Sequence, residues 1–340
     1  MKKRICVIFT GGTIGSYASG DTVDLRSDDK SVLIELYKKQ YGSDIKFDEL
    51  RPLDILSENI QFTDLDAMAS CVRAVNKSKY DGIILTHGTD TLSFTATLFS
   101  QIFCDVSIPV VFVSALYPLN DERSKGVENF AGAVDFIENE GLSGVYVSFK
   151  NDNSNLCIHL ASRITVAEQI SGRFSSVMGA PLCEWVDGKF VYPESPYLPT
   201  KEQISTDRQP YGRYSLCKDI VTIRARSFLD FSYFNFGQKK PRAVIIELYH
   251  SGTVCTAGEE TNVLKFIDYC NKQGVIVILS PVDSTARVYA SAFELKDKCI
   301  LAYDTSFEMT VIKVMLALGE NKDIETELKK NNFFEKIHVN

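Results

Sequence analysis

The feature that most constrains the fold is a change of hydrophobic pattern in the first third of the chain. The apolar run Ile83–Leu85 is typical of a buried strand, whereas apolar residues recur at helical spacing from Leu92 to Phe103. Thr89 and Asp90 lie between the two patterns, directly after Gly88. In an open α/β sheet, ligands bind at the carboxyl edge, where strands lead into helices. Either these two polar residues face a ligand at that edge, or they only cap the helix.

The N-terminus has the same arrangement. Residues 4–9 have the composition of a strand, and Thr10-Gly11-Gly12-Thr13-Ile14-Gly15 follows. This glycine-rich turn matches neither the dinucleotide-binding pattern nor the phosphate loop of nucleotide hydrolases. It does present a hydroxyl, Thr13, which can act as a nucleophile if a base lies nearby. The alternative is an ordinary strand-to-loop turn.

Together, the stretches Phe9–Gly15 and Thr86–Leu92 resemble the two signature motifs of the bacterial-type L-asparaginases, and the cytoplasmic type I branch is the nearer match. Weaker similarity continues through most of the chain, as far as Glu308–Thr310. The resemblance implies an asparaginase/glutaminase-like fold: a larger N-terminal doubly wound α/β sheet and a smaller C-terminal α/β domain with a parallel sheet.

The length of 340 residues also favours two domains, because it exceeds what one core usually serves. Residues 192–214 are rich in prolines and turn formers and are expected to form a linker. We therefore predict an N-terminal α/β catalytic domain over 1–191 and a C-terminal α/β domain over 215–340. The charged, amphipathic stretch 322–336 is expected to be a surface helix.

Composition limits the partners and the compartment. The net charge is −7 with a pI near 5.3, and no basic block occurs, which argues against a nucleic-acid partner. No apolar run is long enough to cross a membrane, and no signal peptide is evident. The nine cysteines are scattered without a C-x-x-C pair, and no zinc pattern is visible. These features predict a cytoplasmic protein that binds neither nucleic acid nor membrane.

The resemblance assigns the catalytic residues. It implies that Thr13 attacks the side-chain amide of the substrate and forms an acyl–enzyme. Tyr17, on the polar loop that follows, would close over the substrate and bond to Thr13. Thr89 and Asp90 would position the water that releases the product. The last catalytic candidate, Arg163, stands near the place where the family has a lysine.

The resemblance also implies a set of substrate-binding residues. Ser57 would donate its hydroxyl to the α-carboxylate, and the Glu58 carboxylate suits the α-ammonium group. The backbone at Ala115 would lie beside the substrate amide. Thr253 stands where the family has an asparagine, in a segment that reaches the active site of a neighbouring subunit. The full set is Gly12, Ser57, Glu58, Gly88, Ala115 and Thr253.

The lysine position is the main departure from the family pattern. Ser162-Arg163 is the best equivalent of the family's Thr-Lys pair, whereas spacing to Phe174 places Thr165 there, and Lys150 lies earlier, at a strand end. An arginine cannot lose its proton and serve as a base. It can still supply positive charge beside Asp90 or a developing oxyanion.

Three functions stay open from the sequence. The first is hydrolysis of L-asparagine to L-aspartate and ammonia. The second is a related amidase acting on glutamine or on a pathway metabolite, including the ammonia-supplying subunit of a tRNA amidotransferase. The third is a catalytically silent homologue that binds an amino acid. We predict a small amino-acid substrate and no cofactor or metal, and the resemblance implies a homodimer or homotetramer.

Overall fold

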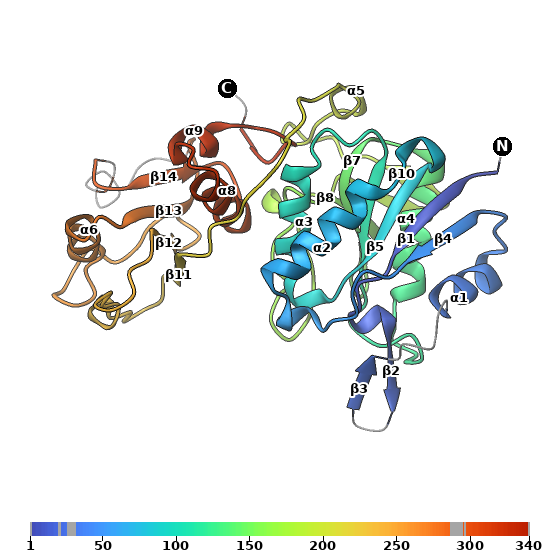
Figure 1. Cartoon of the computed structure of the whole chain (residues 1–340), viewed down its shortest axis with the longest axis horizontal. Helices are drawn as coiled ribbons and strands as arrows, with labels where there is room; N and C mark the ends of the chain where they lie inside the picture. Colours follow the sequence, from blue (N-terminus) through green and yellow to red (C-terminus); the bar gives the residue numbers. More distant parts are fainter. Residues whose placement is uncertain (1, 20–21, 26–31, 286–294, 296, 339–340) are drawn as a thin grey trace. The chain divides into compact units, whose positions relative to one another are not determined.

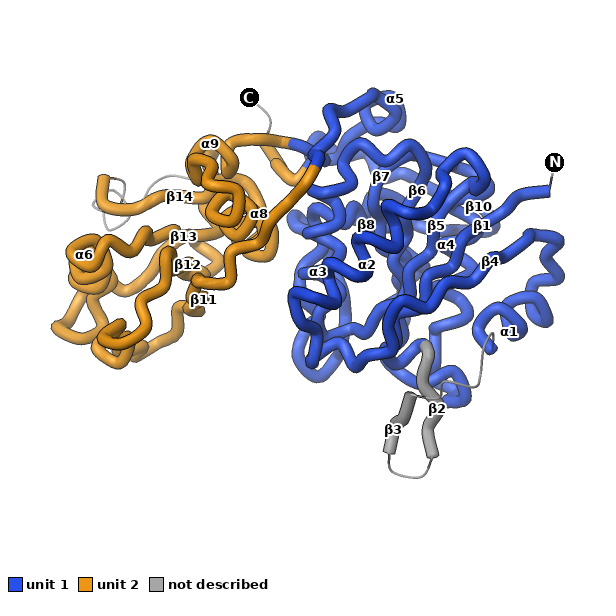
Figure 2. Tube along the Cα trace, in the orientation of Figure 1, with its two compact units in different colours: residues 1–212, 332–334 blue, residues 213–331, 335–340 orange. Residues whose placement is uncertain are grey.

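The computed structural model describes residues 2–19, 22–25, 32–285, 295 and 297–338, and the side chains of residues 15–25 lie outside that description. The chain forms two compact units, residues 1–212 with 332–334 and residues 213–331 with 335–340 (Figure 2). Most of the expected linker belongs to the first unit, because Tyr192, Leu198 and Tyr211 pack against that unit's core.

The first unit is built on an eight-stranded sheet. The strand order is β10-β9-β8-β7-β6-β5-β1-β4. The five strands from β7 to β4 pair in parallel, and β8, β9 and β10 extend the sheet through antiparallel pairings. The strands are β1 (Arg4–Ile8), β4 (Lys46–Leu50), β5 (Gly82–Thr86), β6 (Pro109–Val113), β7 (Gly144–Lys150), β8 (Leu156–Leu160), β9 (Cys183–Val186) and β10 (Lys189–Val191).

Helices cover both faces of this sheet (Figure 1). The helices α1 (Val32–Tyr41) and α4 (Gly126–Asn139) share one face, where the rings of Tyr37 and Phe130 meet edge to face at 5.3 Å. The helices α2 (Phe62–Ala74) and α3 (Thr89–Ile102) cover the other, where Phe99 meets Phe112 of β6 in the same way. Short elements complete the unit: η1 (Thr13–Gly15), β2 (Ser16–Ser19), β3 (Thr22–Leu25), η2 (Ser57–Asn59), η3 (Lys77–Lys79), η4 (Val177–Gly179) and α5 (Lys201–Ile204).

The strand order reverses between β1 and β5. From β1 the chain moves outward to β4, then crosses back to β5 on the other side of β1 and continues through β6 and β7. In open α/β sheets, this switch point is where the loops part and a ligand binds. The turn containing Thr13 follows β1 and the turn containing Thr89 follows β5, so both motifs lie at the switch point.

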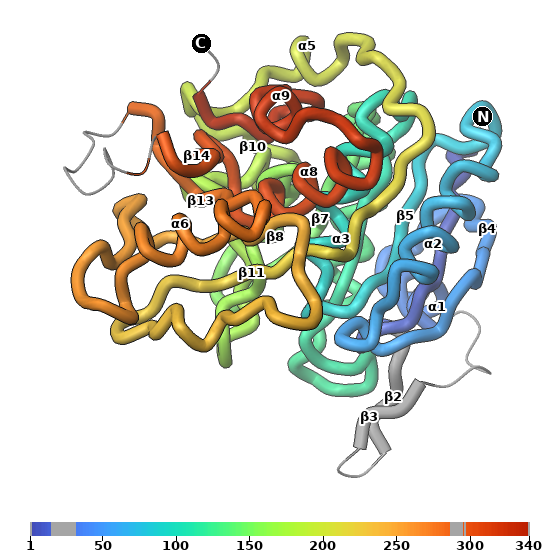
Figure 3. Tube along the Cα trace, turned by 60° about the vertical axis from the view of Figure 1, so that its left-hand side comes forward, coloured from blue at the N-terminus to red at the C-terminus, as the bar shows by residue number. Residues whose placement is uncertain are grey.

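The second unit has a four-stranded parallel sheet in the order β11-β12-β13-β14. Its strands are β11 (Ile220–Arg224), β12 (Ala243–Glu247), β13 (Ile276–Val282) and β14 (Ile300–Tyr303). The helices α6 (Val263–Lys272) and α8 (Phe307–Gly319) lie on opposite faces, η5 (Phe231–Tyr233) packs near α6, and α9 (Ile324–Lys329) packs beside α8 (Figures 1 and 3). The predicted class, two α/β domains with the larger sheet first, is confirmed.

The edge strand β4 carries charged residues, which are tolerated because only one side of the strand is paired. One local expectation differs from the structure. The surface helix expected over 322–336 is limited to α9, since Phe333 and Glu335 are buried. None of the described helices is long and apolar enough to cross a membrane.

Candidate active site

Gly12 and Gly88 bring the two sequence motifs into backbone contact. The strands β1 and β5 are neighbours, with Ile8 opposite Leu85, so the turns that follow them meet. A Cβ added to Gly12 would lie 2.5 Å from the Gly88 nitrogen, and the φ of Gly12 is +81°. Only glycine fits there, because a side chain would clash with backbone and the conformation is left-handed. Thr13 opens η1 and Thr89 opens α3, each one residue beyond this contact.

Thr10 fixes the two turns to each other. Its backbone N–H donates to Thr86 Oγ1 at 3.2 Å, and its hydroxyl donates to the Thr86 carbonyl at 2.6 Å. Both residues are buried, so each polar group needs this partner. Sequence reasoning missed this role for Thr10. The available signal was a hydroxyl residue directly after each of two apolar strand runs.

A third segment, residues 55–59, packs against the same two turns. Gly12 N–H donates to the Ile55 carbonyl at 3.0 Å. The buried Ser57 donates its hydroxyl to Asp90 Oδ2 at 3.5 Å, and Thr91 Oγ1 donates to the Ser57 carbonyl at 2.9 Å. The structure therefore brings Ser57 and Asp90 together, while the neighbouring Glu58 is exposed.

Ala115 lies on the fourth segment of this edge. A Cβ added to Gly126, at the start of α4, would lie 3.3 Å from both the Ala115 Cβ and the Ile14 Cγ1. Ala115 and Ile14 therefore flank one glycine. Since Ile14 follows Thr13 directly, the structure places the Ala115 backbone on the same side of the sheet as the Thr13 turn.

A ladder of hydrogen bonds holds the ends of β5, β6 and β7 in line. Ser114 Oγ donates to the His87 carbonyl at 2.6 Å, and Asn129 Nδ2 donates to the Ser114 carbonyl at 2.7 Å. Asn129 Oδ1 then accepts from the Lys150 backbone N–H at 2.8 Å. Sequence reasoning missed Ser114 and Asn129, because a helix residue that bonds two strands has no local pattern.

His87 holds the peptide of Gly88. Its Nδ1–H donates to the Gly88 carbonyl at 2.8 Å. Burial lowers the pKa of His87 to about 4, because the charged imidazolium would lose its hydration. The ring is thus neutral at physiological pH, and its contact with the glycine backbone is a positioning one.

The structure does not place Arg163 with these residues. The strand β8 runs antiparallel to β7, with Leu160 opposite Tyr146 near the amino end of β7. Arg163 follows Leu160, so it lies at the amino edge of the parallel strands, whereas Thr13 and Thr89 follow carboxyl ends. Its buried guanidinium donates to the carbonyls of Phe334 and Tyr197. The expectation that Arg163 supplies charge beside Asp90 is therefore corrected. Its guanidinium instead binds the chain at residues 197 and 334 through the two carbonyls.

The sequence offered two other positions for the family's lysine, Lys150 and Thr165. Lys150 is the last residue of β7, at the carboxyl edge, and its Nζ is 3.4 Å from Glu128 Oε2. After Arg163 the chain turns back: Thr165 N–H donates to the Ser175 carbonyl, and Phe174 bonds to Asn151, which follows Lys150. Lys150 is thus the basic candidate that the structure places at the correct edge.

Two predicted residues are not part of this assembly as described. Tyr17 belongs to β2, and its side chain lies outside the described residues. Thr253 belongs to the second unit, where its hydroxyl lies 2.9 Å from Ser251 Oγ. Its contact with the site of a neighbouring subunit stays a prediction.

The fold and this edge define a class: two-unit α/β proteins with paired threonine-bearing turns at the switch point of the larger sheet. The family model "Asparaginase, N-terminal" matches residues 4–197, more than half of the chain. The chain therefore belongs to the asparaginase family of amidohydrolases.

Relatives and solved structures agree with this placement. An L-asparaginase of Thermococcus kodakarensis is 27% identical over 336 residues, covering 96% of both chains. A glutamyl-tRNA(Gln) amidotransferase subunit of Methanococcus vannielii is 28% identical over 82% of this chain and 66% of its own length. In fold, the T. kodakarensis L-asparaginase structure matches with a TM-score of 0.78 at 23% identity, covering 98% of this chain and 99% of that one. L-asparaginase I of Vibrio cholerae matches with 0.76 at 23% identity, covering 97% and 98%.

Proposed function

We propose that this chain hydrolyses L-asparagine to L-aspartate and ammonia through an acyl–enzyme on Thr13. The observation that carries the proposal is the Gly12–Gly88 contact, which brings the turns bearing Thr13 and Thr89 together at the switch point. The family membership supports the reaction class, and the end-to-end match to an L-asparaginase supports asparagine as the substrate.

In the first half-reaction, the Thr13 hydroxyl attacks the side-chain amide carbon. Its proton passes by way of Tyr17 or the Asp90 cluster to the amide nitrogen, which leaves as ammonia, and an ester with Thr13 remains. The N-terminus of α3 at Thr89 supports this step, because the first N–H groups of a helix have no partner within the helix and its positive dipole end favours a developing oxyanion.

In the second half-reaction, water attacks the ester carbon. Thr89 and Asp90 position the water and accept its proton, and Thr13 regains its own proton as the carboxylate leaves. In this scheme Lys150 replaces Arg163 as the source of positive charge at the carboxyl edge of the sheet. Lys150 is the last residue of β7, next to Asn151, and its ammonium pairs with Glu128.

Ser57 and Glu58 bind the substrate's α-groups in this proposal. The buried Ser57 hydroxyl lies against Gly88, since a Cβ on that glycine would sit 2.4 Å from Ser57 Oγ. A hydroxyl held this firmly suits a carboxylate, and the exposed Glu58 carboxylate suits an ammonium group. We also infer that the enzyme acts in the cytoplasm as a homodimer or homotetramer, in which Thr253 reaches a neighbouring site. A structure named as a probable cytoplasmic L-asparaginase, from Campylobacter jejuni, has the same fold with a TM-score of 0.70.

The second candidate is ammonia supply within an amidotransferase, favoured by the match to glutamyl-tRNA(Gln) amidotransferase subunits. This chain spans 66% of the M. vannielii relative, so the function of that whole protein is only an alternative here.

Ammonia release from asparagine, glutamine and related amides tests the proposal. We expect turnover of asparagine that is lost in Thr13→Ala and in Thr89→Val, whereas Thr222→Ala, which removes an exposed hydroxyl on the second unit, keeps it. Turnover of glutamine alone would favour the second candidate. Calorimetric binding of asparagine without ammonia release would identify a silent amino-acid-binding homologue and contradict the proposal.

A further inference from the structure

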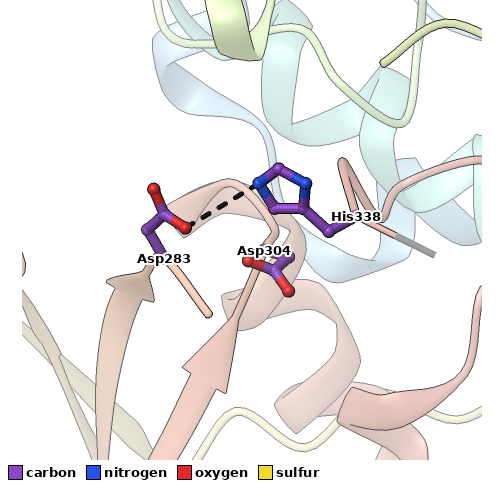
Figure 4. Close-up of side chains that lie close together, drawn as sticks. All are labelled: Asp283, Asp304 and His338. Atoms are coloured by element: carbon purple, nitrogen blue, oxygen red, sulfur yellow. Dashed lines mark ion pairs between the residues drawn. The ribbon is translucent and has the colours of Figure 1, made fainter. Parts of the chain in front are cut away.

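Three metal-ligating side chains meet in the second unit (Figure 4). Asp283 follows β13, Asp304 follows β14, and His338 comes from the C-terminal segment. One carboxylate oxygen of each aspartate and one ring nitrogen of the histidine all lie within 4.8 Å of one another. Within the cluster, His338 Nε2 lies 3.7 Å from Asp283 Oδ1.

The backbone holds all three positions. Val282 and Tyr303 are paired between neighbouring parallel strands, so the aspartates that follow them emerge side by side. The C-terminal segment is tied to the same strand end, because Ile337 N–H donates to the Asp304 carbonyl at 3.0 Å and Lys336 Nζ donates to the Tyr303 carbonyl.

Among the three residues, the environment of Asp304 gives the strongest indication of a ligand. The residue is only 7% exposed. Its Oδ1 accepts from Ser284 N–H at 2.9 Å, and its Oδ2 has no hydrogen-bond partner among the residues that the structure describes. A carboxylate removed from water to this degree is normally paired or coordinated, because leaving it uncompensated is costly. Its side chain faces Asp283 and His338, and the Lys336 ammonium lies near enough to interact with it electrostatically.

We propose that Asp283, Asp304 and His338 bind one divalent metal ion of the zinc or manganese class. Two carboxylate oxygens and one imidazole nitrogen form a mixed oxygen–nitrogen donor set, which suits these ions better than calcium or a thiolate-preferring metal. Three protein ligands leave positions for water, and the Asp283 side chain is 51% exposed, so solvent can reach the ion.

Binding requires a small closure of the cluster. Ligand atoms on a tetrahedral ion lie roughly 3 Å apart, given metal–ligand bonds of about 2 Å. Asp304 is held by Ser284, and Asp283 Oδ1 accepts from the N–H and the hydroxyl of Thr285, each at 2.7 Å. The closure therefore shifts Asp283 together with its hydrogen bonds to Thr285. The nearby Lys336 ammonium opposes a cation, but its bond to the Tyr303 carbonyl holds it on that carbonyl.

The ion would tie the C-terminal segment to the ends of β13 and β14. This role is structural, and the proposed hydrolysis does not depend on it. Sequence spacing gave no sign of the site, because the three residues belong to three separate segments that only the sheet brings together.

Calorimetric titration of Zn²⁺ and of Mn²⁺ into the untagged, chelator-treated full chain tests the proposal. A Cys255→Ser background removes an exposed thiol that would bind zinc by itself. We expect one ion per chain, at least tenfold weaker binding in Asp304→Asn and in His338→Gln, and unchanged binding in His250→Gln, the control on an exposed histidine elsewhere in this unit. Saturating ion should raise the melting temperature of the parent chain by about 5 °C.

The variants stay interpretable because asparagine can still accept the Ser284 N–H, and each must melt like the parent chain without metal before titration. Failure of both ions to bind stoichiometrically would overturn the proposal. So would binding that Asp304→Asn and His338→Gln leave intact, or that His250→Gln weakens equally.

Discussion

Gly12 and Gly88 pack backbone against backbone at the point where the strand order of the larger sheet reverses. The contact joins two segments that are far apart in the chain, and each delivers a threonine to the same edge. Because neither position tolerates a Cβ, the approach of the two turns is a fixed property of the fold. The proposed chemistry depends on this approach more than on any single hydrogen bond.

Gly12→Ala should therefore abolish most activity. The new methyl would displace the Gly88 backbone, and a misplacement of about 1 Å at a reacting group lowers kcat/KM by about 100-fold. Gly42→Ala is the control, since Gly42 also has a positive φ, +63°, but nothing lies within 4 Å of its added Cβ. That change should lower stability by about 1 kcal/mol and leave kcat/KM intact. Equal kinetics for the two variants would show that the contact is unimportant.

Ser57→Ala should raise KM for asparagine by about tenfold or more while kcat changes little. Loss of a hydrogen bond to a charged group is worth about 1.5–3 kcal/mol, and here the bond is made to the substrate before reaction. Steady-state kinetics separate the two constants. A fall in kcat at constant KM would instead place Ser57 in the chemical step, through its contact with Asp90.

Arg163 and Lys150 should behave in opposite ways. Arg163→Met removes two hydrogen bonds from a buried guanidinium to the carbonyls of Phe334 and Tyr197, so we expect a loss of about 2–4 kcal/mol in the free energy of unfolding and nearly unchanged kcat in the folded enzyme. Lys150→Met should leave stability within about 1 kcal/mol and lower kcat at least tenfold. Denaturant melts and ammonia assays on both variants check this, and a reversed pattern would restore Arg163 to the site.

Acid should destabilise the protein through its buried histidines. Burial lowers the pKa of His87 and of His159 to about 4, whereas an unfolded chain has a histidine pKa near 6.5. As pH falls from about 6.5 to 4, the unfolded state takes up these protons and the folded state does not, so stability falls by about 3 kcal/mol per histidine. Asp135 acts in the opposite direction, because burial raises its pKa to about 6.

His159→Gln should remove one of these contributions, so its loss of stability between pH 7 and 5 should be about 2 kcal/mol smaller than that of the parent. Guanidinium melts at the two pH values measure it. If His159→Gln keeps the parent's pH dependence, His159 does not titrate as its burial implies.

The fold could be predicted from sequence where apolar runs mark buried parallel strands, as at residues 4–9 and 83–85. It could not be predicted where the hydrophobic pattern is weak, as in β4, which is a half-exposed edge strand. Nor does any sequence pattern indicate that the chain reverses direction between β7 and β8, which form a hairpin. That reversal is why Arg163, close to the expected place along the chain, lies at the opposite edge of the sheet.

The candidate site was predictable to the extent that its residues sit in the two motifs. Thr10, Ser114 and Asn129 were missed, since their roles come from hydrogen bonds between segments that only the folded sheet brings together. The Asp283–Asp304–His338 cluster was missed for the same reason.

The most direct test of the central claim is trapping of the acyl–enzyme. The Thr89→Val variant should form the ester on Thr13 but hydrolyse it slowly, because the water is no longer positioned. After acid quench with asparagine, peptide mass spectrometry should find one aspartyl group on the peptide containing Thr13, and none when Thr13→Ala is added. An aspartyl group on another residue, or undiminished asparagine turnover by Thr13→Ala, would contradict the account.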